Sequence, residues 1–215
     1  MMLKIQKFVF NMLQENCYVV SDNTNECVII DCGAYYPEER QAIVDYVRDN
    51  NLVPKHLIAT HGHVDHIFGN DTIYQEFGLK VEVHHRDANF VTGACEQAAK
   101  YFGMSLDYDF PPIGKCFSGD DVIEFGEHQL KVIETPGHSQ GSVFLYCEEE
   151  HVAFSGDTLF RFSIGRTDLD GGSMFMIIQS LRMVSQLPDN TVVYPGHGEP
   201  TTIGDEVARN PYIDR

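Results

Sequence analysis

The sequence is poor in basic residues, and it has no apolar run long enough to cross a membrane. Lys and Arg number 15 against 32 Asp and Glu, which gives a formal net charge of −17. A chain this acidic is repelled by phosphate backbones and by anionic lipid surfaces. A membrane-spanning helix needs about 18 or more consecutive apolar residues, and no stretch approaches that length. We therefore expect neither nucleic acid nor a membrane among the partners.

Closely spaced cysteine pairs are also absent. Six cysteines are scattered through the chain without a CxxC motif, so a disulfide scaffold is not indicated. Residues 1–20 alternate as a strand does, and Gln14, Glu15 and Asn16 interrupt them before an apolar run of signal-peptide length can form. These absences favour a cytoplasmic protein with reduced, mostly buried thiols.

Apolar segments of strand length are plentiful. Hydrophobic residues make up 43% of the 215 positions, which is enough for a substantial core. Short runs of strand character recur along the chain. They cover residues 3–10, 17–21, 27–31, 57–60, 81–84, 122–125, 130–135, 143–147, 151–155 and 191–194.

Helical patterns lie between some of these strands. Pro37 at a first helical position, followed by two glutamates, predicts a helix over residues 37–50. A second pattern covers residues 172–187 and a third covers residues 65–77. The apolar face that we expect in the second helix consists of Phe175, Ile178, Leu181 and Val184.

The order of these elements predicts an α/β fold. Two batches of strands, each followed by a helix, suggest two sheets packed together with helices outside. The turn-rich residues 101–121 are the best candidate for a loop or a seam between the halves. No linker, low-complexity tract or charge run divides the chain, so we expect a single domain over residues 1–215.

The heptapeptide THGHVDH places three histidines and an aspartate directly after an apolar strand. A transition metal needs nitrogen, oxygen or sulfur donors held on rigid elements, and imidazole is the usual nitrogen donor. The candidate metal ligands in this motif are His61, His63, Asp65 and His66.

Three further residues of ligand type follow strands downstream. His138 lies in TPGHS, Asp157 in SGDT and His197 in PGHG. Alone, TPGH or PGHG is more simply explained as a turn, but loops at strand ends bring distant residues together, so the four clusters favour one shared site. Five histidines and two aspartates exceed the ligands of one tetrahedral zinc. They suit two metals about 3.5–4 Å apart that share a bridging carboxylate.

The remaining histidines have no paired donors nearby in the sequence. We expect surface or hydrogen-bonding roles for them. Cys32 is the one cysteine at a strand end, which makes it a candidate neighbour of the site. These other histidines are His56, His84, His85, His128 and His151.

The ligand motifs resemble those of the metallo-β-lactamase superfamily, whose hallmark is HxHxDH followed by a His, a bridging Asp and a last His. The resemblance covers nearly the whole chain, and it implies an αββα sandwich of two mixed β-sheets flanked by helices, with the metals at one edge. Among the ligands we place Asp65 and Asp157 as the catalytic residues. The resemblance assigns His61, His63 and His138 to the first metal, and Asp65, His66 and His197 to the second, with Asp157 bridging.

Within the superfamily the sequence looks most like the glyoxalase II branch, the hydroxyacylglutathione hydrolases. The stretches TPGHSQGS, SGDTLFRFSIGRTDL, PGHGEPTTIGDE and NPYI carry this likeness. Glyoxalase II enzymes have a C-terminal helical extension with basic residues for glutathione, whereas this chain ends 18 residues after His197, so the thiol carrier stays open. Arg161 and Arg166 are candidates to pair with a substrate carboxylate. For Arg166, a salt bridge within its own loop is an equal alternative.

The resemblance implies a metal-dependent hydrolase. Two divalent ions, most simply Zn²⁺ with Fe or Mn as alternatives, lower the pKa of a shared water to about 7 and polarise a carbonyl. A thiolate leaving group with a parent pKa of about 8.5 needs little help from a general acid. We therefore predict hydrolysis of a small-molecule thioester, an S-2-hydroxyacyl thiol such as lactoylglutathione.

Two alternatives stay open. Persulfide dioxygenases also resemble this chain, including the GRTD run at residues 165–168, and they bind a single iron, whose ligands here would be His61, His138 and Asp157. A protein that keeps the fold without the chemistry is the other alternative, although all seven ligand positions are filled. The sequence indicates no oligomeric state.

Overall fold

The computed structural model describes residues 3–213, and its strands form two six-stranded sheets. The first sheet consists, in spatial order, of β1 (Lys4–Phe10), β2 (Glu15–Ser21), β3 (Glu26–Ile30), β4 (Val53–Ile58), β5 (Val81–His84) and β6 (Lys115–Phe117). The second consists of β14 (Thr201–Thr202), β13 (Val192–Pro195), β10 (Val152–Gly156), β9 (Val143–Cys147), β8 (His128–Glu134) and β7 (Val122–Phe125). A short hairpin, β11 (Leu159–Phe160) and β12 (Ser163–Ile164), follows β10.

Both sheets are mixed. In the first, β1, β2 and β3 are antiparallel and β3 to β6 are parallel. In the second, β10 and β13 are parallel and the other pairs are antiparallel. The chain passes from the first sheet to the second between Phe117 and Val122, inside the segment predicted as the seam.

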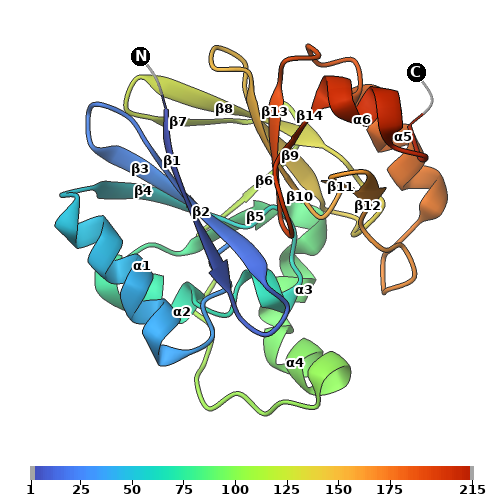
Figure 1. Cartoon of the computed structure of the whole chain (residues 1–215). Coiled ribbons are helices and arrows are strands. Elements are labelled where there is room, and N and C mark those ends of the chain that lie inside the picture. The colour runs from blue at the N-terminus through green and yellow to red at the C-terminus, as the bar shows by residue number, and fades with distance from the viewer. Residues whose placement is uncertain (1–2, 214–215) are drawn as a thin grey trace.

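Helices cover the outer face of each sheet (Figure 1). On the first sheet lie α1 (Pro37–Asp49), α2 (Asn70–Phe77), α3 (Ala88–Thr92) and α4 (Ala94–Phe102). On the second lie α5 (Met174–Val184) and α6 (Ile203–Arg209). The αββα sandwich expected from the sequence is therefore confirmed.

Strand periodicity explains these layers. Successive side chains of a strand point to opposite faces, so in β2 the buried Cys17 and Val19 pack against the helices while Tyr18 and Val20 pack against the second sheet. A strand buried on both faces is apolar without interruption, as the five buried residues of β9 are. Apolar side chains between the two sheets hold them face to face.

Two helix predictions need correction. The helix expected over residues 65–77 is divided into a 3₁₀ turn, η1 (Val64–His66), and α2. Its middle cannot be helical, because Gly69 N–H donates to the carbonyl of Cys32 and the Asn11 amide donates to the carbonyl of Asp65. In a continuous helix, Gly69 N–H would instead donate to the carbonyl of Asp65, four residues earlier.

The apolar face of α5 also differs from the expected one. Phe175 is 71% exposed, whereas Ile177, Leu181 and Val184 are buried. Residues three apart in an α-helix are separated by a rotation about 60° short of a full turn. Four residues chosen at this spacing therefore do not all lie on the face that packs against the core. The helix predicted over residues 37–50 is confirmed as α1, with Ile43, Val44 and Val47 buried.

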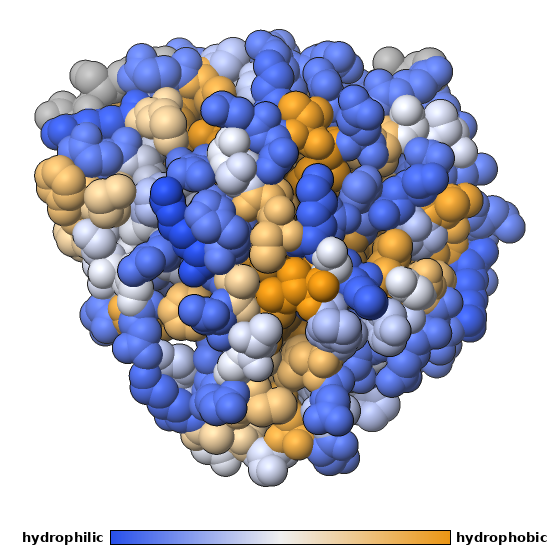
Figure 2. Space-filling view, turned by 180° about the vertical axis from the view of Figure 1, so that it is seen from behind, coloured by the Kyte–Doolittle hydropathy of each residue, from blue (hydrophilic) through white to orange (hydrophobic). Residues whose placement is uncertain are grey.

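The surface is mostly hydrophilic on the face that Figure 2 shows, where apolar residues form small separate patches. Within residues 3–213, no helix is long and apolar enough to span a membrane. All six cysteines are free, and Cys95 and Cys116 are the exposed ones.

Candidate metal centre

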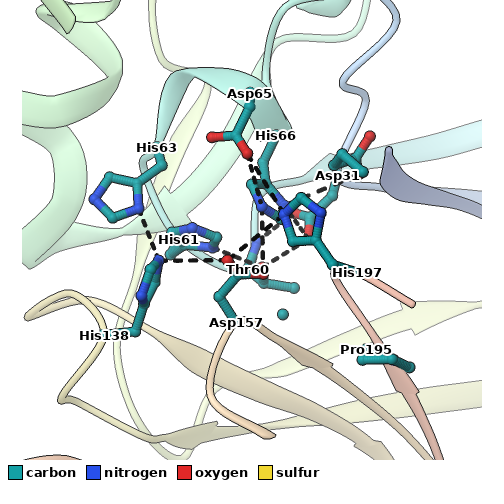
Figure 3. A network of polar contacts seen from close by, with 12 residues as sticks. Asp31, Thr60, His61, His63, Asp65, His66, His138, Asp157, Pro195 and His197 are labelled. Carbon is teal, nitrogen blue, oxygen red and sulfur yellow. Dashed lines mark hydrogen bonds and ion pairs between the residues drawn. The ribbon is translucent and has the colours of Figure 1, made fainter. Parts of the chain in front are cut away.

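The predicted ligands all follow strand ends. His61 follows β4, His138 follows β8, Asp157 directly follows β10 and His197 lies two residues beyond β13. Because β10 and β13 are parallel neighbours, their carboxyl ends lie at the same edge of the second sheet. The residues of THGHVDH lie at the matching edge of the first sheet, and the structure brings all seven side chains together (Figure 3).

The ligand atoms fall into two groups on either side of Asp157 (Figure 3). In one group, His63 Nδ1 lies 2.8 Å from His138 Nε2, which is 3.5 Å from Asp157 Oδ2. In the other, Asp65 Oδ2 lies 3.6 Å from His66 Nε2 and 3.5 Å from His197 Nε2. Each group, His61 with His63 and His138, and Asp65 with His66 and His197, has donor atoms within 4.8 Å of one another.

Asp157 contacts both groups. Its Oδ1 lies 3.4 Å from His66 Nε2, and its Oδ2 lies 3.6 Å from His197 Nε2 and 3.5 Å from His138 Nε2. A carboxylate in this position has one oxygen available to each group, as a bridging ligand requires.

Four of the five histidines direct Nε2 inward, because a protein group holds Nδ1. His66 Nδ1 donates to Asp31 Oδ2 at 3.1 Å, His138 Nδ1 donates to the carbonyl of Arg166 at 2.8 Å, and His197 Nδ1 donates to the carbonyl of Leu13 at 3.1 Å. His61 Nδ1 donates to Thr60 Oγ1 at 3.1 Å. Such outer bonds fix the tautomer and ring orientation of metal-binding histidines.

Three of the inward atoms lack a hydrogen-bond partner. His61 Nε2, His66 Nε2 and Asp157 Oδ1 are buried and accept or donate no hydrogen bond among the described residues. Buried polar atoms without partners are costly. Imidazole nitrogen and carboxylate oxygen are the donors that zinc, iron and manganese accept, so the residues fit divalent metal ions.

At His61, His63 and Asp157 the local electrostatics favour the protonation states of metal ligands, whereas at His66 and His197 the carboxylates of Asp65 and Asp157 outweigh burial and raise the pKa of the imidazole. Burial, reinforced by the neighbouring histidines, lowers the pKa of His61 well below its ordinary value, and burial lowers the pKa of His63 to about 4. For Asp157, burial alone would raise the pKa, but His66 and His197 outweigh it and hold the pKa well below its ordinary value. At neutral pH these directions leave the imidazoles of His61 and His63 neutral and the carboxylate ionised, as coordination requires.

A cavity of about 440 Å³ opens onto these residues. Its walls combine the inward ligands with apolar side chains from the β1–β2 turn, from α4 and from the loop before α5. Beyond the candidate ligands His63, Asp65, His138, Asp157 and His197, it is lined by Leu13, Val64, Gln97, Tyr101, Phe102, Arg166 and Leu169. The cavity is large enough for a small-molecule substrate.

The two candidate arginines lie differently. Arg166 lines the cavity, and its guanidinium forms two hydrogen bonds with Asp168, at 2.7 and 2.8 Å. The loop salt bridge that the sequence allowed is therefore present, on side chains that are 62% and 67% exposed. Arg161 lies over the ring of Phe162, 5.3 Å from its centroid, and is not among the residues that line the cavity.

Sequence reasoning missed the residues that support the candidate ligands. Asp31, one residue before Cys32, accepts from Thr60 N–H and Thr60 Oγ1 at 2.7 Å each as well as from His66. Its signal was a charged residue directly after the buried strand β3. The buried Asn11 amide donates to the carbonyls of Gly33 and Asp65 at 2.9 Å, a link between loops that no local pattern indicates.

Four of the five histidines outside the ligand motifs form hydrogen bonds elsewhere, as expected, whereas Nδ1 of His151 has no hydrogen-bond partner among the described residues. His56, His84 and His128 contact Glu82, Glu134 and Asp22 at 2.6, 2.9 and 3.0 Å. They lie in β4, β5 and β8, away from the group around Asp157.

The chain is similar to a known protein family over most of its length. Residues 11–197 match the family model described as the metallo-beta-lactamase superfamily. The chain belongs to this superfamily. Among curated relatives, it is similar to "Hydroxyacylglutathione hydrolase GloC" of Haemophilus influenzae, with 29% identity over 99% of both chains.

Two solved structures are also similar to this chain. The structure of "BLEG-1 B3 metallo-beta-lactamase" has 32% identity and a TM-score of 0.89, and it covers 97% of this chain and 99% of its own. The structure of "TTHA1623 in a di-iron-bound form" has 34% identity and a TM-score of 0.85, and it covers 97% of this chain and 100% of its own. The superfamily fold with His and Asp clusters able to bind metal is thus established for this chain.

Proposed function

We propose that the chain is a dinuclear metal hydrolase that cleaves a thioester, an S-2-hydroxyacyl thiol such as lactoylglutathione. The observation that carries the proposal is the pair of three-residue donor groups with Asp157 between them. His61, His63 and His138 would hold one ion, and Asp65, His66 and His197 the other. The relative in a di-iron-bound form supports two metals. We propose Zn²⁺, with iron and manganese as alternatives, because His and Asp donors accept all three.

The chain's own groups limit the chemistry. When bound, two divalent ions lower the pKa of a shared water to about 7 and polarise a carbonyl oxygen. Among the residues that line the cavity, every carboxyl and imidazole belongs to the proposed ligand set, and Tyr101 Oη donates to Asp170 at 3.0 Å. The described residues that line the cavity therefore offer no separate general acid for the leaving group, which favours a thiolate over an amine.

The cavity also supports a small acyl thiol as the substrate. Leu13, Phe102 and Leu169 provide apolar walls, and the Arg166 guanidinium at the edge provides a cation for a substrate carboxylate. The similarity to a hydroxyacylglutathione hydrolase over the whole chain points to the same substrate class.

The proposal is tested with purified, zinc-loaded protein and a panel of substrates. The panel contains S-lactoylglutathione, a second 2-hydroxyacyl thiol, a simple ester, a lactone and a β-lactam, the last because a similar structure is described as a lactamase. We expect two metals per chain and fastest turnover of the acyl thiols. The Asp157→Asn variant should lose turnover, whereas Asp45→Asn, on the outer helix α1, should keep it.

Two outcomes would overturn the proposal. Cleavage of the ester, lactone or β-lactam without cleavage of any acyl thiol contradicts the substrate class. One iron per chain with persulfide-dependent oxygen uptake supports the dioxygenase alternative instead.

A further inference from the structure

A buried carboxylate lies outside the proposed ligand set and outside the cavity. Asp87 is the last residue of the 3₁₀ turn η2 (His85–Asp87), between β5 and α3, and it is fully buried. A buried carboxylate is costly unless hydrogen bonds replace its lost hydration. Its partners therefore indicate why it is there.

Three donors from two loops meet on this carboxylate. Asp87 Oδ2 accepts from Gly62 N–H at 2.9 Å and from Ser139 Oγ at 2.6 Å, and Oδ1 accepts from Gly141 N–H at 2.7 Å. Gly62 lies between His61 and His63, and Ser139 directly follows His138. One side chain thus connects the two loops that supply all three histidines of the first group.

Both loops approach Asp87 at glycines, and the fit is tight. A Cβ on Gly62 would lie 2.8 Å from the carbonyl oxygen of Asp87, and a Cβ on Gly141 would lie 2.6 Å from its Cγ. Neither distance is compatible with a side chain, so the loops reach the carboxylate only because both residues are glycine. On the next turn, the Phe90 ring packs against the ring of His63, 5.5 Å between centroids.

We propose that Asp87 is a positioning residue that sets the spacing of the two loops and thereby the metal affinity of the His61, His63 and His138 group. Metal–ligand distances tolerate deviations of only about 0.2 Å. Because this group takes histidines from both loops, a small change in the spacing of the loops changes the distances between its donor atoms. The inference rests on the proposed metal ligands, but it does not depend on the thioester substrate.

The Asp87→Asn variant separates the two loops without changing the side-chain shape. Asparagine offers one accepting oxygen and one NH₂, and that NH₂ must face either Gly62 N–H or Gly141 N–H, so one loop loses its bond whichever way the amide lies. We expect the affinity for one of the two metals to fall about 10–100-fold, the usual effect of losing an outer-shell partner.

The Asp22→Asn variant is a matched control. Asp22 is also a buried carboxylate, 1% exposed, and it accepts from Thr24 N–H and Glu127 N–H at 2.9 and 2.7 Å in a different region. If loss of a buried carboxylate acted only through stability, both variants would show the same change in metal binding.

Zinc stoichiometry by native mass spectrometry and competition with a chromophoric chelator give the readout. We expect two zinc ions in the wild type and in Asp22→Asn, and one tight and one weak ion in Asp87→Asn. Adding His197→Ala to Asp87→Asn should weaken the remaining ion too, because His197 belongs to the other group. Ser139→Ala removes one of the three bonds, and it should shift the same affinity by a smaller factor even if Asp87→Asn does not fold.

The outcomes for Asp87 and for the dinuclear site are distinguishable. Equal zinc affinities in Asp87→Asn and Asp22→Asn, or in Ser139→Ala and the wild type, would overturn the role of Asp87. A wild-type protein that binds one ion contradicts the dinuclear proposal, and Asp87 is then judged by whether its variants weaken that ion.

Discussion

Replacing Gly196 by alanine tests how closely the backbone must approach the proposed bridging ligand. A Cβ on residue 196 would lie 2.3 Å from Asp157 Oδ1 and 2.7 Å from His66 Cε1. Ordinary contacts between such atoms need about 3.5 Å. The carboxylate of Asp157 or the loop before His197 must therefore move by about 1 Å to accommodate one methyl group.

This displacement is several times the tolerance of a metal site, which is about 0.2 Å. We expect Gly196→Ala to lose at least one of two bound zinc ions. The same shift at a reacting centre lowers the rate by about 100-fold, so kcat/KM for the preferred acyl thiol should fall at least that far. Overpacking of a buried site should also lower the free energy of unfolding by about 1–3 kcal/mol.

Gly78→Ala provides the control, because Gly78 ends α2 at φ 72° and a Cβ there meets nothing within 4 Å. The Gly78→Ala variant should lose about 1 kcal/mol of its free energy of unfolding from backbone strain alone, and its metal content should not change. Metal content comes from mass spectrometry, stability from urea unfolding and rates from thiol release. Two zinc ions in Gly196→Ala, with kcat/KM within about tenfold of the wild type, that is within 1.4 kcal/mol, would refute the argument.

Three further predictions concern stability and specificity. At Asp22, burial alone would raise the pKa, but hydrogen bonds from Glu127, Thr24 and His128 outweigh it and hold the pKa below its ordinary value. The stability this provides is present above the unfolded pKa of about 3.9 and is lost as pH falls through the folded pKa. Asp22→Asn should therefore be about 1–3 kcal/mol less stable than the wild type at neutral pH. The free energies of unfolding of the two proteins, measured in urea, should approach each other below about pH 4, and a difference that stays constant there would contradict the argument. Free zinc at about 100 times its Kd should add about 2.7 kcal/mol per site, measured as a higher urea midpoint that a chelator reverses, whereas an unchanged midpoint would count against metal binding. Arg166→Ala should raise KM about tenfold for carboxylate-bearing thioesters relative to neutral ones. Its melting temperature should change little, because the pair of Arg166 with Asp168 is exposed. Equal KM changes for both substrate types would show that Arg166 does not contact the substrate.

The strands were predictable where apolar residues run without interruption. The buried runs in β3, β5, β9 and β10 were located to within about two residues, as expected of boundaries from sequence. The strand β2 begins two residues earlier than predicted, because Glu15 and Asn16 are buried although polar. Their burial depends on the opposite loop, since Asn16 N–H donates to the carbonyl of Gly196 at 2.7 Å, a contact that no local pattern contains.

Short elements could not be predicted for a related reason. The strand β6 has only three residues, two of them exposed, and it exists because β5 offers it a parallel edge. The helix α4 was not predicted, although its buried Ala94, Gln97 and Ala98 share one face. Alanine and glutamine give a weak apolar signal, so their burial depends on tertiary packing rather than on pattern.

The two carboxylates that support the proposed ligands, Asp31 and Asp87, also lie after strands, as the ligands do. Strands β3, β4 and β5 are parallel, so Asp31 after β3 and Asp87 shortly after β5 lie at the edge where THGHVDH follows β4. Applied to every acidic residue, and not only to those near histidines, a search at strand ends would have found both. It would not have separated supports from ligands, because all are carboxylates. Hydrogen bonding separates them: N–H and O–H donors contact both oxygens of Asp31 and of Asp87, whereas Asp157 Oδ1 is buried with no hydrogen-bond partner among the described residues.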